Sequence, residues 1–299
     1  MRRILANLSL KLKVTFFTLI LFLLSIGLIT YQFSAHLREE LEVSLSEQQL
    51  SEVSFVAERI DNAVKLRIDS LALIANSITP QLLTDSPQLS AFLAERKAIY
   101  KLYKLGLIVI SKDGRGLADF PHADGRARAD FSQRDFYRQV MTSGKPAISK
   151  PGIGRFIKDP RLVIAVPIFN KSKQIVGVLA GILSLSDDSL LSDFNISTHP
   201  NTSAYLVVSP HDNLFVAATD KSRILQALPS PGINAMHDRY MRGYEGSGIA
   251  VNSRGVEELS SAKKIPSADW FVVGVIPTAI AFERITHIRN EAILSAIFV

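Results

Sequence analysis

LVIAVPIF at residues 162–169 and IVGVLAGILSL at residues 175–185, joined across the polar turn KSKQ, are the stretch that decides the fold of this chain. Both runs carry no charge and are rich in β-branched residues, which favours strands over helices. The short polar turn between them predicts antiparallel pairing. We therefore expect them to be central strands of an antiparallel sheet that has helices on one side.

A hairpin precedes these two strands. GLIVIS at residues 106–111 and GLADF at residues 116–120 are separated by KDGR, whose Asp-Gly dipeptide favours a tight turn. The following segment FSQRDFYRQVMTSG, residues 131–144, predicts a short helix that ends at Gly144.

A weaker copy of this arrangement follows downstream. AYLVVS and LFVAAT, at residues 204–209 and 214–219, repeat the hairpin. GIAVN, VEELSSAKKI and WFVVGVI predict three more strands at residues 248–252, 256–265 and 270–276. The simplest account is internal duplication of a strand-rich module of about 90 residues.

A long helix is predicted before both modules, because no Gly or Pro occurs between Leu28 and Thr79. Apolar residues recur in it at spacings of three and four, close to a heptad pattern. They are Val53, Val56, Ile60, Val64, Ile68, Leu71, Ile74 and Ile78. This stripe can pack on the chain's own modules, on a partner subunit, or on both. We expect a homodimer in the full-length protein.

A membrane anchor is predicted near the N-terminus. Residues 14–33, VTFFTLILFLLSIGLITYQF, carry no charge, and as a helix of about 1.5 Å per residue they would span roughly 30 Å, the hydrocarbon thickness of a bilayer. The run is longer than the apolar part of a signal peptide, and no clear cleavage site follows it. Four cations precede it, namely Arg2, Arg3, Lys11 and Lys13. The positive-inside rule then predicts that the following residues lie outside the cytoplasm.

The composition excludes several classes of function. The net charge is +6, but four of these charges belong to the N-terminal cations, so the charge does not indicate a nucleic-acid partner. There is no cysteine and hence no disulfide or thiolate metal site. The six histidines have no metal-ligand spacing, and no nucleotide-binding or hydrolase motif occurs. We expect no metal, no cofactor and no catalytic site in this region.

The order and spacing of these motifs resemble the double Cache (dCache) family of extracytoplasmic sensor domains. The matching features are the helix from the membrane, the KDGRG hairpin, FSQRDFY, AISKP, the VPIF and VGVLAGILSL strands, and ADWFVVGVIP. The resemblance covers about residues 35–285. It implies an α+β fold in which a transmembrane helix and a long N-terminal stalk helix are followed by two stacked PAS-like modules, antiparallel sheets flanked by helices.

The resulting organisation has six parts. They are a cytoplasmic tail (1–13), a transmembrane helix (14–33), a stalk helix (34–80), a membrane-distal PAS-like module (81–190), a membrane-proximal PAS-like module (191–281), and a helix that leads into the start of a second transmembrane segment (282–299). The resemblance implies a receptor in the bacterial inner membrane with most of this region in the periplasm. A cytoplasmic output domain would follow, for which we favour a histidine kinase or a cyclic-di-GMP enzyme over a chemotaxis transducer.

In this family the ligand pocket usually lies in the distal module. Arg134, Phe136 and Tyr137 offer suitable chemistry, because a guanidinium grips a carboxylate with two hydrogen bonds, an aromatic ring covers an aliphatic or cationic ligand, and a phenol adds an oriented hydrogen bond. Amino-acid-binding members hold the ligand carboxylate with an Arg-x-aromatic-Tyr element, which QRDFY matches. Asp119, Ser149 and Lys150 flank the same helix in family members, and we include them as candidate site residues.

Two parts of the family's amino-acid signature are absent. Ala129 stands where the family has Tyr, and Gly181 or Ile182 stands where it has the Asp that binds the ligand's ammonium. An unpaired, desolvated ammonium is costly. We therefore predict a small carboxylate or other anion as the ligand. The alternatives are an amino-acid sensor of a chemotaxis transducer, a tethered hydrolase, and a structural dimerisation stalk.

A structural role for the same residues also remains open at this point. Arg134 would then brace the loop that carries Asp130, and Phe136 and Tyr137 would be ordinary core aromatics.

The predicted topology can be tested with reporter fusions. Alkaline phosphatase fused after residue 200 should be active, because the N-terminal cations hold the first residues inside the cytoplasm and the chain beyond the anchor outside it. A green fluorescent protein that fluoresces when fused at the same point would show that the orientation is wrong.

Overall fold

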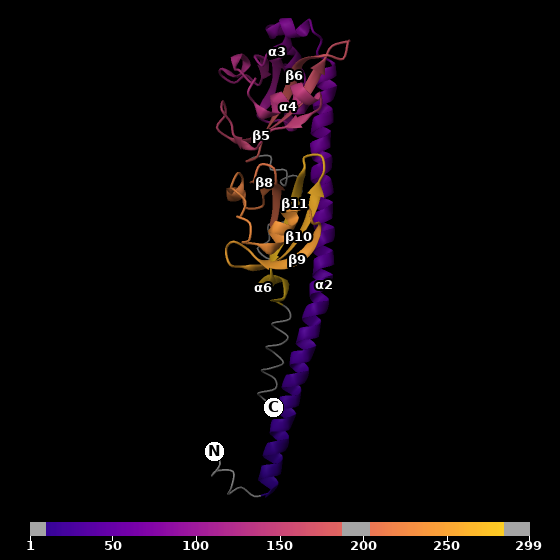
Figure 1. The fold of residues 1–299 in the computed structure, drawn as a ribbon, viewed down its shortest axis with the longest axis vertical. Helices are drawn as coiled ribbons and strands as arrows, with labels where there is room; N and C mark the ends of the chain where they lie inside the picture. The colour runs from indigo at the N-terminus through magenta and orange to yellow at the C-terminus, as the bar shows by residue number, and fades with distance from the viewer. Residues whose placement is uncertain (1–9, 187–203, 284–299) are drawn as a thin grey trace.

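The computed structural model describes residues 10–186 and 204–283, and one long helix runs along its whole length (Figure 1). Helix α2 (Leu10–Asn76) is continuous over 67 residues, so the predicted membrane segment and stalk form a single helix. From Val14 onward it contains a stretch long and apolar enough to cross a membrane, and that stretch is not buried in the protein. Arg2, Arg3 and residues 284–299, which include most of the predicted second membrane segment, lie outside the described residues.

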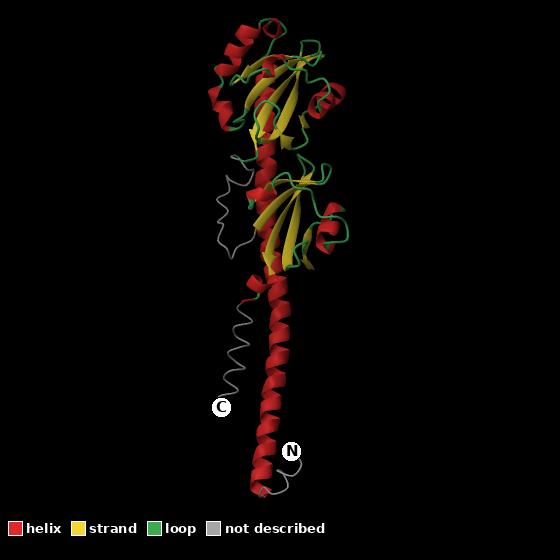
Figure 2. Cartoon of the chain, turned by 90° about the vertical axis from the view of Figure 1, so that its left-hand side faces the viewer, coloured by secondary structure: helices red, strands yellow, loops and turns green. Residues whose placement is uncertain are grey.

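Two antiparallel sheets are stacked along α2 (Figure 2). The distal sheet, farther from the apolar end of α2, has the order β2-β1-β6-β5-β3, and β4 pairs with β5. The proximal sheet has the order β8-β7-β11-β10-β9. Position by position the two orders correspond, as a duplicated module requires. We call the parts built on these sheets the distal and proximal modules.

The predicted strands agree closely with observed ones, whereas β3, β4 and α3 were not predicted. The distal strands are β1 (Gly106–Ser111), β2 (Gly116–Phe120), β3 (Ala147–Ile148), β4 (Gly152–Ile153), β5 (Pro160–Phe169) and β6 (Ile175–Ser184). The proximal strands are β7 (Ala204–Ser209), β8 (Leu214–Ala218), β9 (Gly246–Val251), β10 (Glu257–Ile265) and β11 (Trp270–Pro277). The other α-helices are α3 (Ser86–Ala94), α4 (Asp135–Ser143), α5 (Ala235–Met241) and α6 (Thr278–Ala281), and short 3-10 helices are η1 (Leu82–Thr84), η2 (Lys97–Lys101), η3 (Arg126–Arg128) and η5 (Lys221–Arg223).

Side chains alternate along each strand, so each sheet has one face toward α2 and one face away from it. In the distal sheet Leu107 packs in the cluster around α2, whereas its neighbour Ile108 packs with the side chains of α4. The proximal sheet repeats this arrangement, with Val272 toward α2 and Val273 toward α5. The faces turned away from α2 are the ones on which cavities form.

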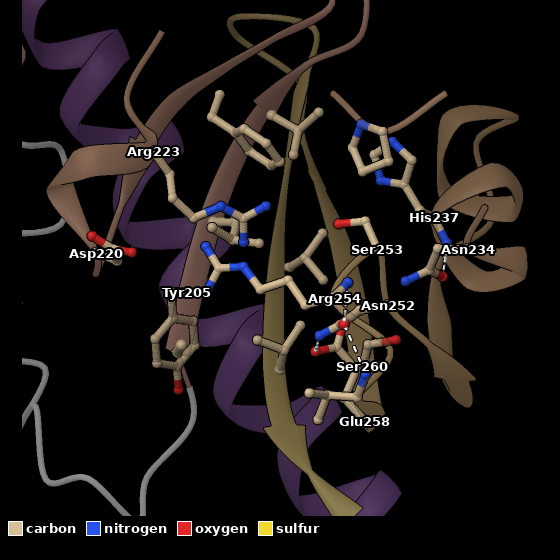
Figure 3. A pocket seen from close by; sticks show the side chains of 18 of the residues that line it. Tyr205, Asp220, Arg223, Asn234, His237, Asn252, Ser253, Arg254, Glu258 and Ser260 are labelled. Atoms are coloured by element: carbon tan, nitrogen blue, oxygen red, sulfur yellow. Dashed lines mark hydrogen bonds between the residues drawn. The ribbon is translucent and has the colours of Figure 1, made fainter. Parts of the chain in front are cut away.

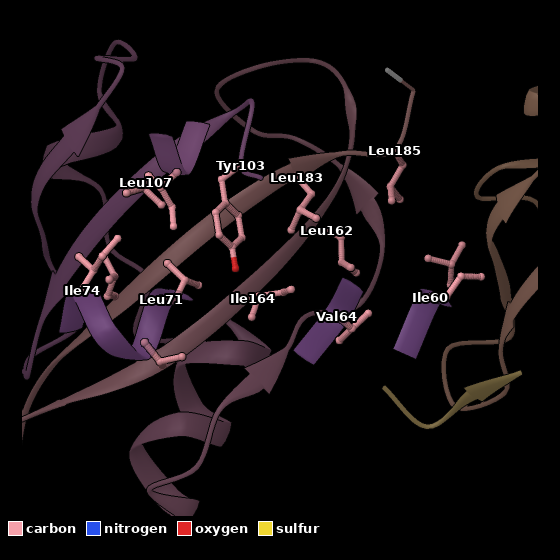
Figure 4. Close-up of a cluster of buried hydrophobic side chains, with 14 of the residues drawn as sticks. Ile60, Val64, Leu71, Ile74, Tyr103, Leu107, Leu162, Ile164, Leu183 and Leu185 are labelled. Atoms are coloured by element: carbon pink, nitrogen blue, oxygen red, sulfur yellow. The ribbon is translucent and has the colours of Figure 1, made fainter. Parts of the chain in front are cut away.

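The apolar stripe of α2 is buried against both sheets (Figure 4). Val53, Val56 and Ile60 are at most 6% exposed, and they belong to the same core cluster as the sheet residues. This confirms that the stripe packs on the chain's own modules. It also corrects the expectation that the same stripe packs on a partner, because a second subunit would reach these side chains only by displacing the sheets.

One close contact fixes the distal sheet relative to α2. The buried ring of Tyr103 lies over Gly181 of β6, and a Cβ atom at that glycine would be 2.4 Å from the ring carbons. The Tyr103 hydroxyl donates a hydrogen bond of 2.7 Å to the carbonyl oxygen of Arg67 in α2. Burial raises the pKa of this hydroxyl, so it remains a neutral donor.

Gly181→Ala should destabilise the protein, because the added methyl group cannot fit unless the Tyr103 ring moves and its hydrogen bond to α2 is lost. We expect the free energy of unfolding to fall by about 1–3 kcal/mol. Gly152→Ala is the matched control, since nothing lies within 4 Å of a Cβ atom there. Urea-induced unfolding of the purified chain in detergent measures both. Equal losses in the two variants would contradict the packing described.

Candidate functional site

The distal module contains a small cavity on the sheet face turned away from α2. Ile108, Val163 and Ile182 of the sheet line it, together with residues 154–157, which follow β4. Its volume is about 40 Å³. Since one water needs roughly 10–15 Å³ of such space, the cavity has room for about three waters. Any ligand held in this arrangement must be small.

Four arginines line this cavity, namely Arg126, Arg134, Arg155 and Arg161, and the charges of Arg134 and Arg161 lie close enough to affect each other. Arg134 precedes α4 as its N-cap residue, and Arg161 lies near the start of β5. A buried N–H group at Nη1 of Arg161 has no hydrogen-bond partner among the described residues. Burial lowers the pKa of Arg161, and the nearby charge of Arg134 lowers it further, against the opposing effect of Asp135. Two like charges with an unused donor between apolar walls favour the binding of an anion.

Of the three residues predicted from QRDFY, two line the distal cavity and one does not. Arg134 and Phe136 line it. The hydroxyl of Tyr137 lies instead 2.6 Å from the carbonyl oxygen of Lys112 and 3.2 Å from that of Ser111. Tyr137 therefore ties α4 to the turn of the first hairpin.

Asp119 lies outside the cavity, in a buried ion pair with Arg126. Its Oδ2 atom accepts 2.8 Å hydrogen bonds from Nε of Arg126 and from the backbone N–H of Ala123, and Oδ1 is 3.1 Å from Nδ1 of His122. The paired side chains of Asp119 and Arg126 are 1% and 2% exposed. Arg126 also donates to the carbonyl oxygens of Leu105 and Pro121. These contacts hold the loop after β2 in place.

Ser149 and Lys150 also lie outside the distal cavity. The Ser149 hydroxyl accepts a hydrogen bond from the backbone N–H of Val163, and the backbone N–H of Lys150 donates to Asp135. Both residues line an open groove between the two modules, across from Trp270. The distal cavity thus brings together only Arg134 and Phe136 of the six predicted residues.

A much larger cavity, of about 370 Å³, lies in the proximal module on the equivalent sheet face (Figure 3). Polar side chains from the loop after β8, from α5 and its N-cap residue, from the turn between β9 and β10, and from β10 itself enter it. They include Asp220, Arg223, Asn234, His237, Asn252, Arg254, Glu258 and Ser260. Phe215, Val208, Val273 and Val275 form an apolar wall.

Burial shifts the pKa of three groups in this proximal cavity. It raises the pKa of Glu258, although Asn252 donates a 2.8 Å hydrogen bond to that carboxylate. It lowers the pKa of Arg223, which the charge of Arg254 lowers further. It also lowers the pKa of His237. Such perturbed groups in a cavity are typical of binding sites.

The residues of the proximal cavity were not predicted from the sequence. Arg223 and Arg254 stand in the turn sequences KSR and NSRG, which match no motif. The one available signal is the internal duplication, because a repeated module repeats the sheet face on which a cavity can form.

Comparison with known proteins identifies the family. The family model dCache_1, described as a Cache domain, matches residues 33–285. A search of curated protein sequences found no match.

Among solved structures, the chain is similar to ligand-binding domains of chemoreceptors. That of the amino-acid chemoreceptor PctB of Pseudomonas aeruginosa PAO1, in complex with L-Arg, is 19% identical, with a TM-score of 0.63 and coverage of 80% of this chain and 97% of that one. That of CtaA of Pseudomonas fluorescens, with L-alanine, is 19% identical, with a TM-score of 0.62 and coverage of 80% and 99%. That of PctC of Pseudomonas aeruginosa PAO1, with GABA, is 16% identical, with a TM-score of 0.60 and coverage of 78% and 100%.

At these identities the structural likeness shows the fold alone. Since the family model covers most of the chain, from the middle of α2 to the end of the proximal module, the chain belongs to the double Cache family of extracytoplasmic sensor domains.

Proposed function

We propose that this chain is the periplasmic sensory region of a receptor in the bacterial inner membrane, and that its distal module binds a small carboxylate or a similar anion. The observation that carries the ligand class is the pair of guanidiniums of Arg134 and Arg161 in the distal cavity, with a donor of Arg161 left unpartnered. A carboxylate between them would accept hydrogen bonds from both and remove their mutual repulsion.

The size and lining of the distal cavity narrow the ligand further. Apart from the arginines, the lining is mostly apolar and includes Phe131, Phe136 and Phe156. About 40 Å³ suits a carboxylate with a short alkyl chain, whose apolar end would contact these rings. Ligand binding would shift the populations of two arrangements of the module relative to α2, which carries the change toward the membrane.

An amino-acid ligand is the alternative, because the similar chemoreceptor domains were solved with amino acids and GABA. The described residues that line the distal cavity include no Asp or Glu to receive an ammonium group. Ile182 lines the cavity where the family has this Asp, whereas Gly181 faces Tyr103. Asp119 cannot substitute, since its oxygens are engaged by Arg126 and Ala123. We therefore favour a ligand without an ammonium group.

Acetate or propionate should stabilise the chain against thermal unfolding, by about 2.7 kcal/mol at 100 times the dissociation constant. Arg134→Ala and Arg161→Met should each abolish this shift in a thermal melt of the purified chain. Arg161→Met should not lower the melting temperature without ligand, because it removes a partly buried charge that has an unpartnered donor.

Arg138→Ala is the matched control for this test. Arg138 lies on the same helix α4, is exposed and does not line the distal cavity, so the ligand shift should remain. A large drop in the melting temperature of unliganded Arg134→Ala would support the bracing role for Arg134. Tight binding of L-alanine would contradict the ligand class.

The full-length receptor is proposed to be a homodimer that pairs through the exposed side of α2. Phe55, Leu66 and Leu73 are 59%, 56% and 70% exposed there. Leu66 and Leu73 are one heptad apart, and the guanidinium of Arg59, one heptad before Leu66, stacks on the ring of Phe55. This face is opposite the stripe that packs on the sheets, so it remains available to a second copy.

Single cysteines at Leu66 or Leu73 should form disulfide-linked dimers in membranes under mild oxidation. Cysteines at Val53, Val56 or Ile60 should not, because these positions are covered by the chain's own sheets. Non-reducing gels distinguish the two sets. Crosslinks at the buried positions but not at the exposed ones would show that the dimer interface lies on the other face of α2.

A further inference from the structure

The proximal cavity has the dimensions of a ligand pocket, with a volume of about 370 Å³ against the roughly 300–1,000 Å³ of known small-molecule sites. Its size follows from the length of the connection that covers this sheet face. In the distal module β4 and residues 154–157 cover the sheet face, and Phe156 enters the cavity. In the proximal module only a tight turn connects β9 to β10, so the same face stays open.

Two guanidiniums converge in this space (Figure 3). Arg223 enters from the loop after β8, with its guanidinium 4.3 Å from the centroid of the Phe215 ring. Arg254 enters from the turn between β9 and β10. Neither side chain forms an ion pair or a hydrogen bond with a described residue, and the nearby carboxylate of Asp220 is bonded to Ser222. Both guanidiniums therefore have donors that no described residue accepts.

A carboxylate lies at another part of the same cavity. Glu258, on β10, accepts a hydrogen bond from Asn252 but forms no ion pair with either described arginine. It is half-buried, and its remaining acceptor capacity is directed to the cavity. The apolar wall of Phe215, Val273 and Val275 lies alongside these polar groups. This arrangement suits an elongated ligand that has an anionic group at one end and a hydrogen-bond donor at the other.

We propose that the proximal module holds a second ligand site, in which Arg223 and Arg254 bind the carboxylate or phosphate head of a small organic anion. Glu258 accepts a hydrogen bond from a donor group at the other end of that ligand. It also disfavours a second negative charge there, because two like charges in a partly buried site repel. The site is separate from the distal one and shares no residue with it.

The position of this site connects it to α6, the last helix that the structure describes. Pro277 and Ile280, at the junction of β11 and α6, line the cavity. Glu257, next to Glu258 on β10, points to the opposite face, where Thr278 donates to it at 2.8 Å and Arg38 of α2 lies 3.9 Å away. A ligand beside Glu258 therefore acts on the place where α2 and the end of the proximal module meet.

The test uses the full chain in detergent with the distal site silenced by Arg134→Ala and Arg161→Met, so that failure of one site cannot conceal the other. Calorimetric titrations use propionate and lactate as carboxylates, and glycerol 3-phosphate and inorganic phosphate as phosphates. Lactate and glycerol 3-phosphate also carry a hydroxyl group that can donate to Glu258. At least one organic anion should bind. Arg254→Gln should weaken it by about 10- to 100-fold, the loss expected for one charged hydrogen bond.

Arg242→Gln is the matched control, since Arg242 is exposed at the end of α5 and does not line the cavity. It should leave the affinity unchanged. Glu258→Gln should preserve binding but remove any preference for lactate over propionate. If none of the four probes binds, or if binding is equally strong in Arg254→Gln, the proposal is wrong. Binding of inorganic phosphate alone would also overturn it, because an adventitious ion needs no organic body.

Discussion

Burial of one helical stripe against two sheets is the interaction on which the rest of the structure depends. A sheet with two apolar faces must cover both, and a single helix covers one face of both sheets here. Each fully buried side chain of the stripe contributes about 1.5–3 kcal/mol relative to its exposed state. Because the two modules share this helix, they are joined to a common rod, and in the distal module α3 and Tyr103 add to the cover of the same face.

Polar contacts set the axial position of the helix against the sheets. Gln49 accepts a 2.8 Å hydrogen bond from Ser261 of β10, and Asp61 accepts one of 2.8 Å from the backbone of Ser267. Tyr103 adds a third bond to α2 in the distal module. A small sliding of α2 would break these bonds together, so a shift of the helix is a step between separate states and not a gradual drift. A sensor needs such states, because a ligand can only change their populations.

The sheet faces turned away from α2 differ between the two modules. Both modules have the same strand order, yet their cavities differ in volume from about 40 to about 370 Å³. The cause is the connection that precedes β5 in the distal module and β10 in the proximal module. The connection before β5 carries Phe156, whereas the one before β10 is a tight turn. Arg134 and Arg161 in the distal cavity, and Arg223 and Arg254 in the proximal one, nevertheless have no described acidic partner at ion-pair distance. The two modules share one strand order, while the covering loops set the size of each cavity.

Local patterns were sufficient to determine the strands, the hairpins and the long helix of this protein. The apolar runs and the Asp-Gly turn predict β1, β2, β5 and β6 to within two residues, because burial and turn geometry act on neighbouring residues. The helix α4 begins later than predicted, at Asp135, since Asp130 accepts a hydrogen bond from the backbone of Ser132 and holds the preceding residues in a turn.

The candidate sites were decided by tertiary structure. The sequence places Arg134, Tyr137 and Asp119 among the site residues, but the fold directs only Arg134 into the distal cavity and joins it to Arg161, which is 27 positions away. Asp119 is ion-paired with Arg126, and the Tyr137 hydroxyl is hydrogen-bonded to the backbone of the hairpin. Whether a charged side chain is paired or left free depends on loops that meet only after the sheet has formed. Local sequence determines which elements form, whereas long-range packing determines which of their polar groups still lack a partner.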